Sequence, residues 1–463
     1  MDKETYEAFA ESLMNAHQTP GAMIALSNQR YQKGFGYRDR ENELPVTADT
    51  IFGIGSITKS MTCIAVLQLQ EDGLLSVHDP IKTHLPEMTF QGSEDITLHH
   101  LMTHTSGIPP LNTLFYANKQ AMERDGSFNM QIKMGAPLDR EQDSIDTYDD
   151  LINYLNAIQI VLLDRPGKSF SYSNDGYALL GIIIERVSGQ LYERYIEKNV
   201  FEPLGMNNSF FNPNQLDERA ARLYSIDPTA ETPTIIHSPE WWDAPAMWSA
   251  GYVKSTANDM LRFGNVFLKD GNGILTAESL TALTSLHIEV EPGRHYGYGV
   301  MVTPDFFGTT LIEHGGGIKG VTAQFAVLPE KSMAAICLTN IAGAPAEALL
   351  KGAVQSDMGI DPDKAAIKYD NYTLTEADRQ AITGVYQSNE GQTIKVYEKD
   401  AALFVEIQGT EMPTRAVGRQ AVTITMHGTE HLLQFTDDRL HFGFRQLVKS
   451  GSFLQDKTLN KMN

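Results

Sequence analysis

The chain has 463 residues, of which 42% are hydrophobic and 21% charged, a composition that fits a soluble globular protein and excludes a disordered, collagenous or coiled-coil chain. Acidic residues outnumber basic residues by 58 to 37, and the resulting net charge of −21 repels nucleic-acid phosphates and anionic lipid surfaces. With two cysteines, a polar start and no run of about 18 apolar residues, we expect a cytoplasmic protein without disulfides, nucleic-acid partners or membrane contacts.

The first part of the chain predicts a mixture of helices and strands. A helix is expected over residues 1–15, strands over 21–26 and 31–37, and a long helix over 56–73 that ends at a glycine. This long helix is apolar on nearly all sides, which is typical of a buried central helix. Residues 111–149 mix charged residues with Gly and Pro, show weak periodicity and are interpreted as an insertion.

The middle of the chain returns to regular patterns. Helices are expected over 150–163 and 177–187, the second capped by Asn174 or Asp175 and closed by Gly189. Further strands are expected over 298–302, 310–313, 323–328 and 334–338. Because strands lie on both sides of a helical part, the order predicts one sheet assembled from distant segments.

The last part of the chain changes in character. After about residue 376, apolar and polar residues alternate over short stretches that turn signals separate, a pattern typical of an all-β sandwich or barrel. The residues just before this stretch are polar and are interpreted as a linker. We therefore expect a first domain over 1–355, a linker over 356–375, and a separate β domain over 376–463.

Ser56 and Lys59 form the single Ser-x-x-Lys motif of the chain. Residues three apart share a helix face, so the hydroxyl and the amine are expected side by side at the start of the long helix. Serine is a weak nucleophile without a base, and desolvation lowers the pKa of a lysine far enough to supply one. The alternative interpretation is a polar helix turn with a solvated lysine.

Tyr172 and Asn174 form a Tyr-x-Asn motif on a constrained loop just before a helix cap. The same spacing begins at Tyr116 and at Tyr154, but Tyr116 lies in the insertion and Tyr154 lies inside a predicted helix. An adjacent ammonium would lower the pKa of the Tyr172 phenol and make it a proton shuttle. The alternative is that Tyr172 only packs within its loop.

His314 is followed by Gly315, Gly316 and Gly317, and this stretch lies between two predicted strands. Glycines at such a place let a substrate backbone approach closely and leave backbone N–H groups free to bind an oxyanion. Similar Lys/His-x-Gly triplets, such as the one at Lys133, lack strands on both sides. The alternative is a plain glycine turn.

Taken in chain order, these motifs resemble the serine β-lactamase and penicillin-binding protein superfamily, in the branch of class C β-lactamases, D-aminopeptidases and related esterases. The resemblance runs from about residue 10 to residue 345. It implies an α+β fold, in which an antiparallel sheet is flanked by helices and joined to an all-helical region. The connecting signatures are LMTHTSG at 101–107, PGKSFSYSNDGY at 166–177, PLGM at 203–206, STANDM at 255–260 and LTN at 338–340.

The resemblance also implies acyl transfer to a serine followed by hydrolysis of the acyl-enzyme. Ser56 would be the acylated nucleophile, and Lys59 would hold or relay its proton. Tyr172 would act as the general base in acylation and would then protonate the leaving group. Asn174 would bind either Lys59 or the substrate amide.

The third motif departs from the pattern of many relatives, which carry a lysine where this chain has His314. His314 would face the far end of the substrate, and the backbone N–H groups of Ser56 and Gly317 would form the oxyanion hole. A fixed positive charge helps to bind a carboxylate, whereas the charge of a histidine near neutral pH is conditional. We therefore do not expect efficient β-lactam hydrolysis, and we expect Lys319 to be a solvated turn residue.

The tail of the chain fits the same branch, because some of its peptidases carry β-barrels that resemble lipocalins. In such enzymes the additional domain restricts access to the site or builds a homo-oligomer. The leading hypothesis is a D-stereospecific peptidase or amidase that acts on small substrates and needs no cofactor or metal. The alternatives are a carboxylesterase and a weak β-lactamase or penicillin-binding protein.

Three other classes of protein agree less well with the sequence. His100 and His104 have the spacing of zinc ligands on a helix, but the segment between them lacks the Glu of a zinc-protease helix. An α/β-hydrolase requires a Gly-x-Ser-x-Gly motif, which the chain lacks. A catalytically silent binding protein on the same fold is the third alternative, although all three motifs are intact.

Overall fold

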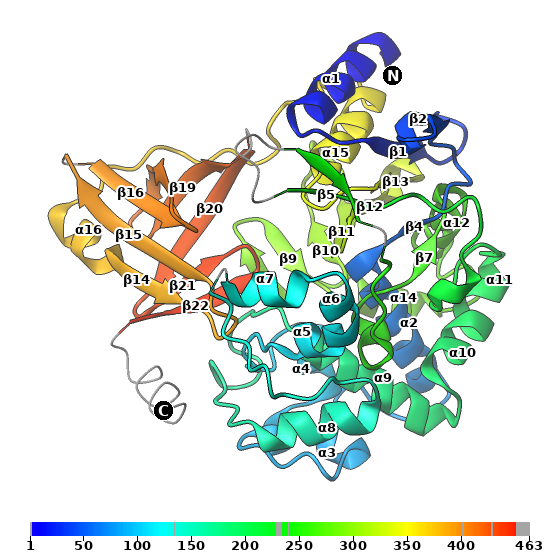
Figure 1. Ribbon diagram of the computed structural model, residues 1–463, viewed down its shortest axis with the longest axis horizontal. Helices are drawn as coiled ribbons and strands as arrows, with labels where there is room; N and C mark the ends of the chain where they lie inside the picture. The colour runs from blue at the N-terminus through cyan, green and yellow to red at the C-terminus, as the bar shows by residue number, and fades with distance from the viewer. Residues whose placement is uncertain are drawn as a thin grey trace.

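The larger part of the protein is built on a nine-stranded antiparallel sheet whose strands come from two distant parts of the chain (Figure 1). A computed structural model describes residues 2–133, 135–227, 234–238, 240–400, 402–426 and 429–450. In sheet order the strands are β3 (Leu44–Pro45), β2 (Tyr31–Asp39), β1 (Gly21–Leu26), β13 (Met333–Thr339), β12 (Val321–Leu328), β11 (Leu311–Ile318), β10 (Met301–Thr303), β9 (Arg294–Tyr296) and β8 (Ile288–Glu291).

Strand β1 pairs with β13 and so joins the two sets of strands, with Ala22 opposite Thr339. Helices cover both faces of the sheet. One face is covered by α1 (Lys3–Ala16) and α15 (Ala346–Asp357), and the other by α12 (Ala257–Phe263) and α13 (Asn265–Leu268). Every residue of β1 and β13 is therefore buried. The prediction of one sheet assembled from distant segments is confirmed.

Between the two sets of strands, the chain forms a helical region around the central helix α2 (Thr58–Glu71), which packs against α9 (Asn174–Ser188). Eleven of the fourteen residues of α2 are buried, because its side chains are apolar or small on nearly every side. Within the described parts of the chain, no helix combines the length and the apolar composition that a membrane crossing requires.

The remaining elements of this region are short. Its helices are α3 (Ile81–His84), η2 (Ser93–Asp95), α4 (Leu98–Met102), α5 (Thr113–Ala117), α6 (Lys119–Arg124), α7 (Ser127–Lys133), α8 (Tyr148–Ala157), α10 (Tyr192–Ile196), η3 (Glu197–Phe201), α11 (Glu202–Leu204), η4 (Pro213–Gln215), η5 (Pro245–Ala250) and α14 (Ala277–Leu283). Two small two-stranded sheets pair β4 (Phe52–Gly53) with β7 (Lys254–Ser255), and β5 (Tyr224–Ile226) with β6 (Ile235–His237). A last turn, η6 (Pro329–Lys331), precedes β13.

Several predicted boundaries are wrong for local reasons. Ser56 precedes the central helix and lies in the 3-10 turn η1 (Gly55–Ile57). The helix expected over 150–163 is shorter and stops where Ile158 adopts an extended backbone. The insertion carries three short helices, α5, α6 and α7, that its weak periodicity did not indicate. The glycine stretch after His314 is no turn, because its extended backbone pairs with β12 along the whole motif.

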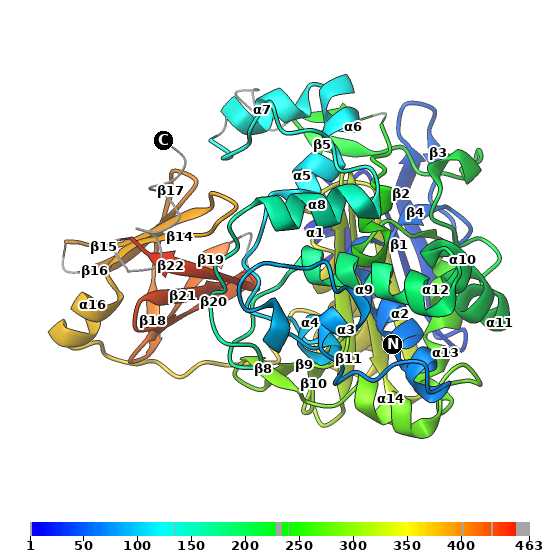
Figure 2. The same cartoon turned by 90° about the horizontal axis from the view of Figure 1, so that it is seen from below.

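The residues that follow α15 form a second, smaller body with its own apolar core (Figure 1, Figure 2). A short helix, α16 (Glu376–Ile382), leads into nine antiparallel strands that curl into an almost closed barrel. In sheet order they are β17 (Thr410–Pro413), β16 (Ala402–Ile407), β15 (Thr393–Lys399), β14 (Gly384–Gln387), β22 (Arg445–Lys449), β21 (Arg439–Phe442), β20 (Thr429–Thr436), β19 (Ala421–Met426) and β18 (Arg415–Gly418). We call this body the C-terminal β domain; the domain boundaries given above stay a prediction, and residues 451–463 lie outside the described residues.

The packing between the sheet and its helices yields a stability prediction. Phe325 on β12 is fully buried, and its ring lies 5.4 Å from that of Phe263 and 5.9 Å from that of Phe267. Phe325→Ala should lower the free energy of unfolding by about 3–5 kcal/mol, because it leaves a cavity that rigid neighbours cannot fill. Urea denaturation should show no more than about 0.5 kcal/mol for Leu286→Ala, whose side chain is exposed. Similar losses for the two variants would contradict this packing.

Candidate active site

The candidate site begins at the turn that precedes α2. Gly55 adopts a left-handed backbone with φ of 52°, which turns the chain sharply from β4 into η1. Ser56 follows on this turn and is partly exposed, whereas Lys59 lies in the first turn of α2 and is fully buried. The two side chains meet as predicted, with 3.1 Å between Lys59 Nζ and Ser56 Oγ.

Lys59 Nζ has two further oxygen partners. It donates to Asn174 Oδ1 at 2.8 Å and to the carbonyl of Ala250 at 2.5 Å. Three oxygens from three separate elements thus take the three hydrogen-bonding directions of one nitrogen. The prediction that Asn174 binds Lys59 agrees with this geometry, whereas the Ala250 carbonyl, a backbone group without a sequence signature, could not be foreseen.

The surroundings of Lys59 favour its neutral form. Burial lowers the pKa of Lys59 well below its usual value, and the positive charge of Arg445 lowers it further. Cys63 and Asp175 act in the opposite direction without cancelling the effect of burial. A neutral amine within hydrogen-bonding distance of a serine hydroxyl can accept its proton.

Tyr172 also lies close to Lys59. It belongs to a loop that hydrogen bonds with His104 keep in position. His104 Nδ1 accepts the N–H of Ser173 at 3.1 Å, and the carbonyl of His104 accepts the N–H of Ser171 at 2.9 Å. The rings of His104 and Tyr172 lie 4.1 Å apart. Lys59 Nζ lies 4.8 Å from the centre of the Tyr172 ring, so the hydroxyl, the amine and the phenol come together.

The expected effect on the Tyr172 phenol is wrong. Burial raises the pKa of Tyr172 above its usual value, and this effect exceeds the lowering by a hydrogen bond with Ser56 and by the charge of Arg445. The reason is that a nearby amine can lower the pKa of a phenol only while it is charged, and burial disfavours the charged form of Lys59. The phenol therefore holds its proton near neutral pH.

His314 lies on β11, beside the three elements described above. Its Nδ1 lies 2.6 Å from the carbonyl of Gly315, and its Nε2 lies 3.0 Å from the hydroxyl of Tyr296. A neutral ring that carries its proton on Nδ1 satisfies both contacts. Burial lowers the pKa of His314 to about 3, so the ring brings no positive charge to the site.

The glycines after His314 let β11 approach the Ser56 turn. A side-chain carbon on Gly316 would lie 1.9 Å from the carbonyl oxygen of Ile54, and one on Gly55 would lie 2.6 Å from the nitrogen of Gly317. The two backbones therefore touch, which brings the Gly317 N–H to the turn that carries Ser56. This placement suits an oxyanion hole made of backbone N–H groups.

The alternative candidates from the sequence, namely the Tyr116 and Tyr154 motifs and the His100–His104 pair, do not form a second site of this kind among the described residues. The rings of Tyr116 and Tyr154 pack against each other with centres 5.6 Å apart. His100 Nδ1 accepts the N–H of Thr97 within a capping box at the start of α4, so His100 and His104 serve different loops. The expectation of a solvated Lys319 is wrong, because its side chain is largely buried and forms an ion pair with Asp125 of the insertion.

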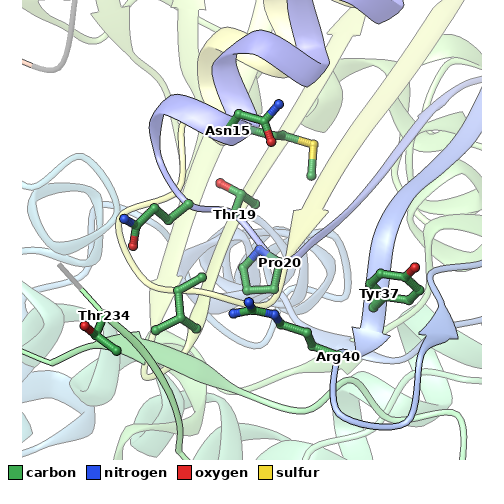
Figure 3. A pocket seen from close by; sticks show the side chains of 9 residues that line it. Asn15, Thr19, Pro20, Tyr37, Arg40 and Thr234 are labelled. Carbon is green, nitrogen blue, oxygen red and sulfur yellow. The ribbon is translucent and has the colours of Figure 1, made fainter.

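A surface pocket is found elsewhere, between α1, β2 and the β5–β6 hairpin (Figure 3). None of its lining residues belongs to the Ser56 site. It is lined by Met14, Asn15, Gln18, Thr19, Pro20, Tyr37, Arg40, Thr234 and Ile235.

Comparison with known proteins assigns the family. A family model described as Beta-lactamase matches residues 7–356. The chain therefore belongs to the Beta-lactamase family, whose members are serine hydrolases, and the resemblance drawn from the motifs is confirmed.

Two relatives extend over most of the chain. Penicillin-binding protein 4* of Bacillus subtilis (strain 168) is 25% identical over 420 residues, which cover 86% of this chain and 86% of the relative. The solved octameric penicillin-binding protein homologue from Pyrococcus abyssi is 28% identical, with a TM-score of 0.70, and the match covers 97% of this chain and 100% of that chain. The predicted fold class, including the additional C-terminal barrel, is confirmed.

A third solved protein shares the fold of the larger part. It is the D-amino acid amidase from Ochrobactrum anthropi SV3 complexed with D-phenylalanine, with 23% identity and a TM-score of 0.60. The match covers 77% of this chain and 97% of that chain. At this level of identity the likeness concerns the fold alone.

The contact between β11 and the Ser56 turn can be tested with two glycine-to-alanine variants, one at the contact and one away from it. Gly316→Ala should slow the labelling of Ser56 by a fluorophosphonate by about 10²-fold, because the methyl group forces the two backbones apart. Gly176→Ala in α9 is the control, since an added carbon there lies 3.4 Å from the Leu101 side chain, an ordinary contact, and it should label within a few-fold of the wild type. Equal labelling of both variants would show that the close contact does not matter.

Proposed function

We propose that the protein hydrolyses small amide or peptide substrates by way of an acyl-enzyme on Ser56, with a preference for D-amino-acid derivatives. One observation carries the proposal: the buried Lys59 amine lies 3.1 Å from the Ser56 hydroxyl, and burial lowers its pKa well below the usual value. A serine with an adjacent neutral base is the arrangement that nucleophilic catalysis requires.

The acylation step follows from the lowered pKa of Lys59 and the raised pKa of Tyr172. Neutral Lys59 takes the proton of Ser56 as Oγ attacks the substrate carbonyl, and the Gly317 and Ser56 N–H groups bind the developing oxyanion. Tyr172, which keeps its proton, donates it to the leaving nitrogen as the carbon–nitrogen bond breaks. The ammonium of Lys59 then returns a proton to the Tyr172 oxygen, so the net proton moves from serine to leaving group.

Deacylation runs through the same groups in reverse. Lys59 takes the proton of Tyr172, and the Tyr172 oxygen in turn takes a proton from a water molecule in the place of the leaving amine as the water oxygen attacks the acyl carbon. Ser56 Oγ recovers a proton from Lys59 when the acyl group departs. Asn174 keeps its hydrogen bond to Lys59 in both steps and so orients the nitrogen.

Two features support small substrates and the D-amino-acid preference. The Asp125–Lys319 ion pair ties the insertion to the chain two residues beyond Gly317, and Trp242 Nε1 donates to Asp125 Oδ2 at 3.0 Å. The motifs resemble the D-aminopeptidase branch, and a D-amino acid amidase shares the fold. The neutral His314 supplies no fixed charge for the carboxylate of a β-lactam, which favours amides over β-lactams.

A substrate panel tests this proposal. Wild-type protein should hydrolyse D-aminoacyl amides and nitroanilides faster than their L-counterparts and a chromogenic β-lactam. Ser56→Ala should lower the rate by about 10³-fold or more, since the nucleophile is lost. Ser60→Ala, one turn further along α2 with its hydroxyl bound to the Ile57 carbonyl, is the control and should remain active. Brisk hydrolysis of short esters without amide turnover would reject the amidase proposal in favour of an esterase.

The pH dependence tests the neutral state of His314. Because the pKa of His314 is lowered to about 3, its ring stays uncharged above roughly pH 4 and contributes no step to the rate between pH 5 and 8. His314→Gln should therefore leave the shape of the kcat/KM profile unchanged over this range, even if the rate falls. A limb near pH 6–7 that disappears in His314→Gln would contradict a neutral His314.

A further inference from the structure

The connection between β21 and β22 in the C-terminal β domain reaches the loop that carries Tyr172. The carbonyl of Phe444 accepts the N–H of Tyr172 at 3.0 Å. Arg445 Nη1 donates to the carbonyl of Tyr172 at 3.1 Å. Both main-chain polar groups of Tyr172 are thus bound by two consecutive residues that lie more than 270 positions later in the chain.

The Arg445 side chain is itself held in place. Its Nε lies 3.1 Å from Glu390 Oε2, and its Nη2 lies 3.4 Å from Glu390 Oε1, so the guanidinium faces the carboxylate with two nitrogens. Its central carbon lies 5.4 Å from the centre of the Tyr172 ring. One guanidinium therefore links Glu390, the backbone of Tyr172 and the face of its ring.

Other contacts fix the same connection against the larger part. The ring of Phe444 lies 6.5 Å from that of Phe170 and 5.5 Å from the guanidinium of Arg294. Gly391, next to Glu390, packs so closely on Pro137 of the insertion that an added side-chain carbon would lie 2.5 Å away. The C-terminal β domain thus contacts the Tyr172 loop and the insertion at once.

We propose that Arg445 is a positioning residue of the Ser56 site, supplied by the C-terminal β domain: together with Glu390 it holds the backbone and ring of Tyr172 against Lys59. This inference rests on the proposed function, because it assigns the second domain a part in that reaction. A phenol misplaced by about an ångström cannot protonate the leaving group efficiently, so kcat is lowered.

The charge of Arg445 gives this role a signature that a purely structural contact lacks. It lowers the pKa of both Lys59 and Tyr172, so its removal shifts both values upward. Since Lys59 must be unprotonated to accept the serine proton, the acidic limb of the rate profile then moves to higher pH. The other titratable groups around Lys59 and Tyr172 are Cys63, His104, Asp175, Tyr177, Tyr296, His314 and Glu390.

The experiment compares variants of the full-length protein. Arg445→Gln removes the charge, Arg445→Lys keeps it but loses the fork geometry, and Glu390→Gln removes the anchor. Arg379→Gln is a matched control in the same domain, because Arg379 also pairs through Nε with a glutamate at 3.1 Å and through Nη1 with a carbonyl. The readouts are the rate of Ser56 labelling by a fluorophosphonate from pH 5 to 9, kcat and KM for a D-aminoacyl amide, and the thermal midpoint.

Arg445→Gln should lower kcat about tenfold or more with a smaller change in KM, and should move the acidic limb upward by roughly one pH unit. Arg445→Lys should leave the acidic limb of the pH profile at its wild-type position and should restore part of the kcat that is lost in Arg445→Gln. Glu390→Gln should lower kcat without the upward shift of the limb, and Arg379→Gln should match the wild type.

Two results would overturn the inference in different ways. If Arg445→Gln labels and turns over like Arg379→Gln at every pH, the positioning role is wrong while the serine-hydrolase proposal stands. If wild-type Ser56 does not label at all, the proposed function fails and this inference fails with it. If Arg445→Gln does not fold, Arg445→Lys and Glu390→Gln are compared with the control Arg379→Gln instead. Kinetics equal to those of the control would again show that the positioning role is wrong.

Discussion

The burial of the Lys59 amine is the constraint on which the site depends. A nitrogen without water must find protein acceptors, because an unpaired polar group in the interior is costly. Lys59 has two carbonyl acceptors, Asn174 in α9 and Ala250 in η5, and the Ser56 hydroxyl in η1 takes its third hydrogen-bonding direction. These partners fix the relative positions of three elements that lie far apart in the sequence. The same burial that lowers the pKa of Lys59, and so favours the unprotonated amine, thus also assembles the groups around it.

The sheet contributes the other side of the site through backbone contact. Gly55 and Gly316 let η1 and β11 approach so closely that no side chain fits between them. The opposite side of β11 is anchored just before His314, where buried Glu313 binds Arg294 at 2.8 Å and Lys351 at 3.1 Å. The strand is therefore held between an ion-pair network and the serine turn, which leaves its N–H groups little freedom to move.

Local signals made much of this arrangement predictable. The Ser56–Lys59 spacing implies a shared helix face, and the apolar run over β1 gave its bounds without error. The meeting of Tyr172 with this pair followed only from the resemblance, since no local rule joins residues so distant. The direction of the Tyr172 pKa was missed because it depends on burial, which is set by the whole fold. Arg445 was missed because it carries no motif and comes from the second domain.

The hydrogen bonds from Phe444 and Arg445 to Tyr172 have a consequence for biosynthesis. The 273 positions between Tyr172 and Arg445 take roughly 15–55 s to translate at typical elongation rates of about 5–20 residues per second. During that interval the nascent chain can already join Ser56 to Lys59 while the phenol still lacks its support. If Arg445 positions Tyr172 as proposed, full turnover begins only after the barrel has closed on the loop.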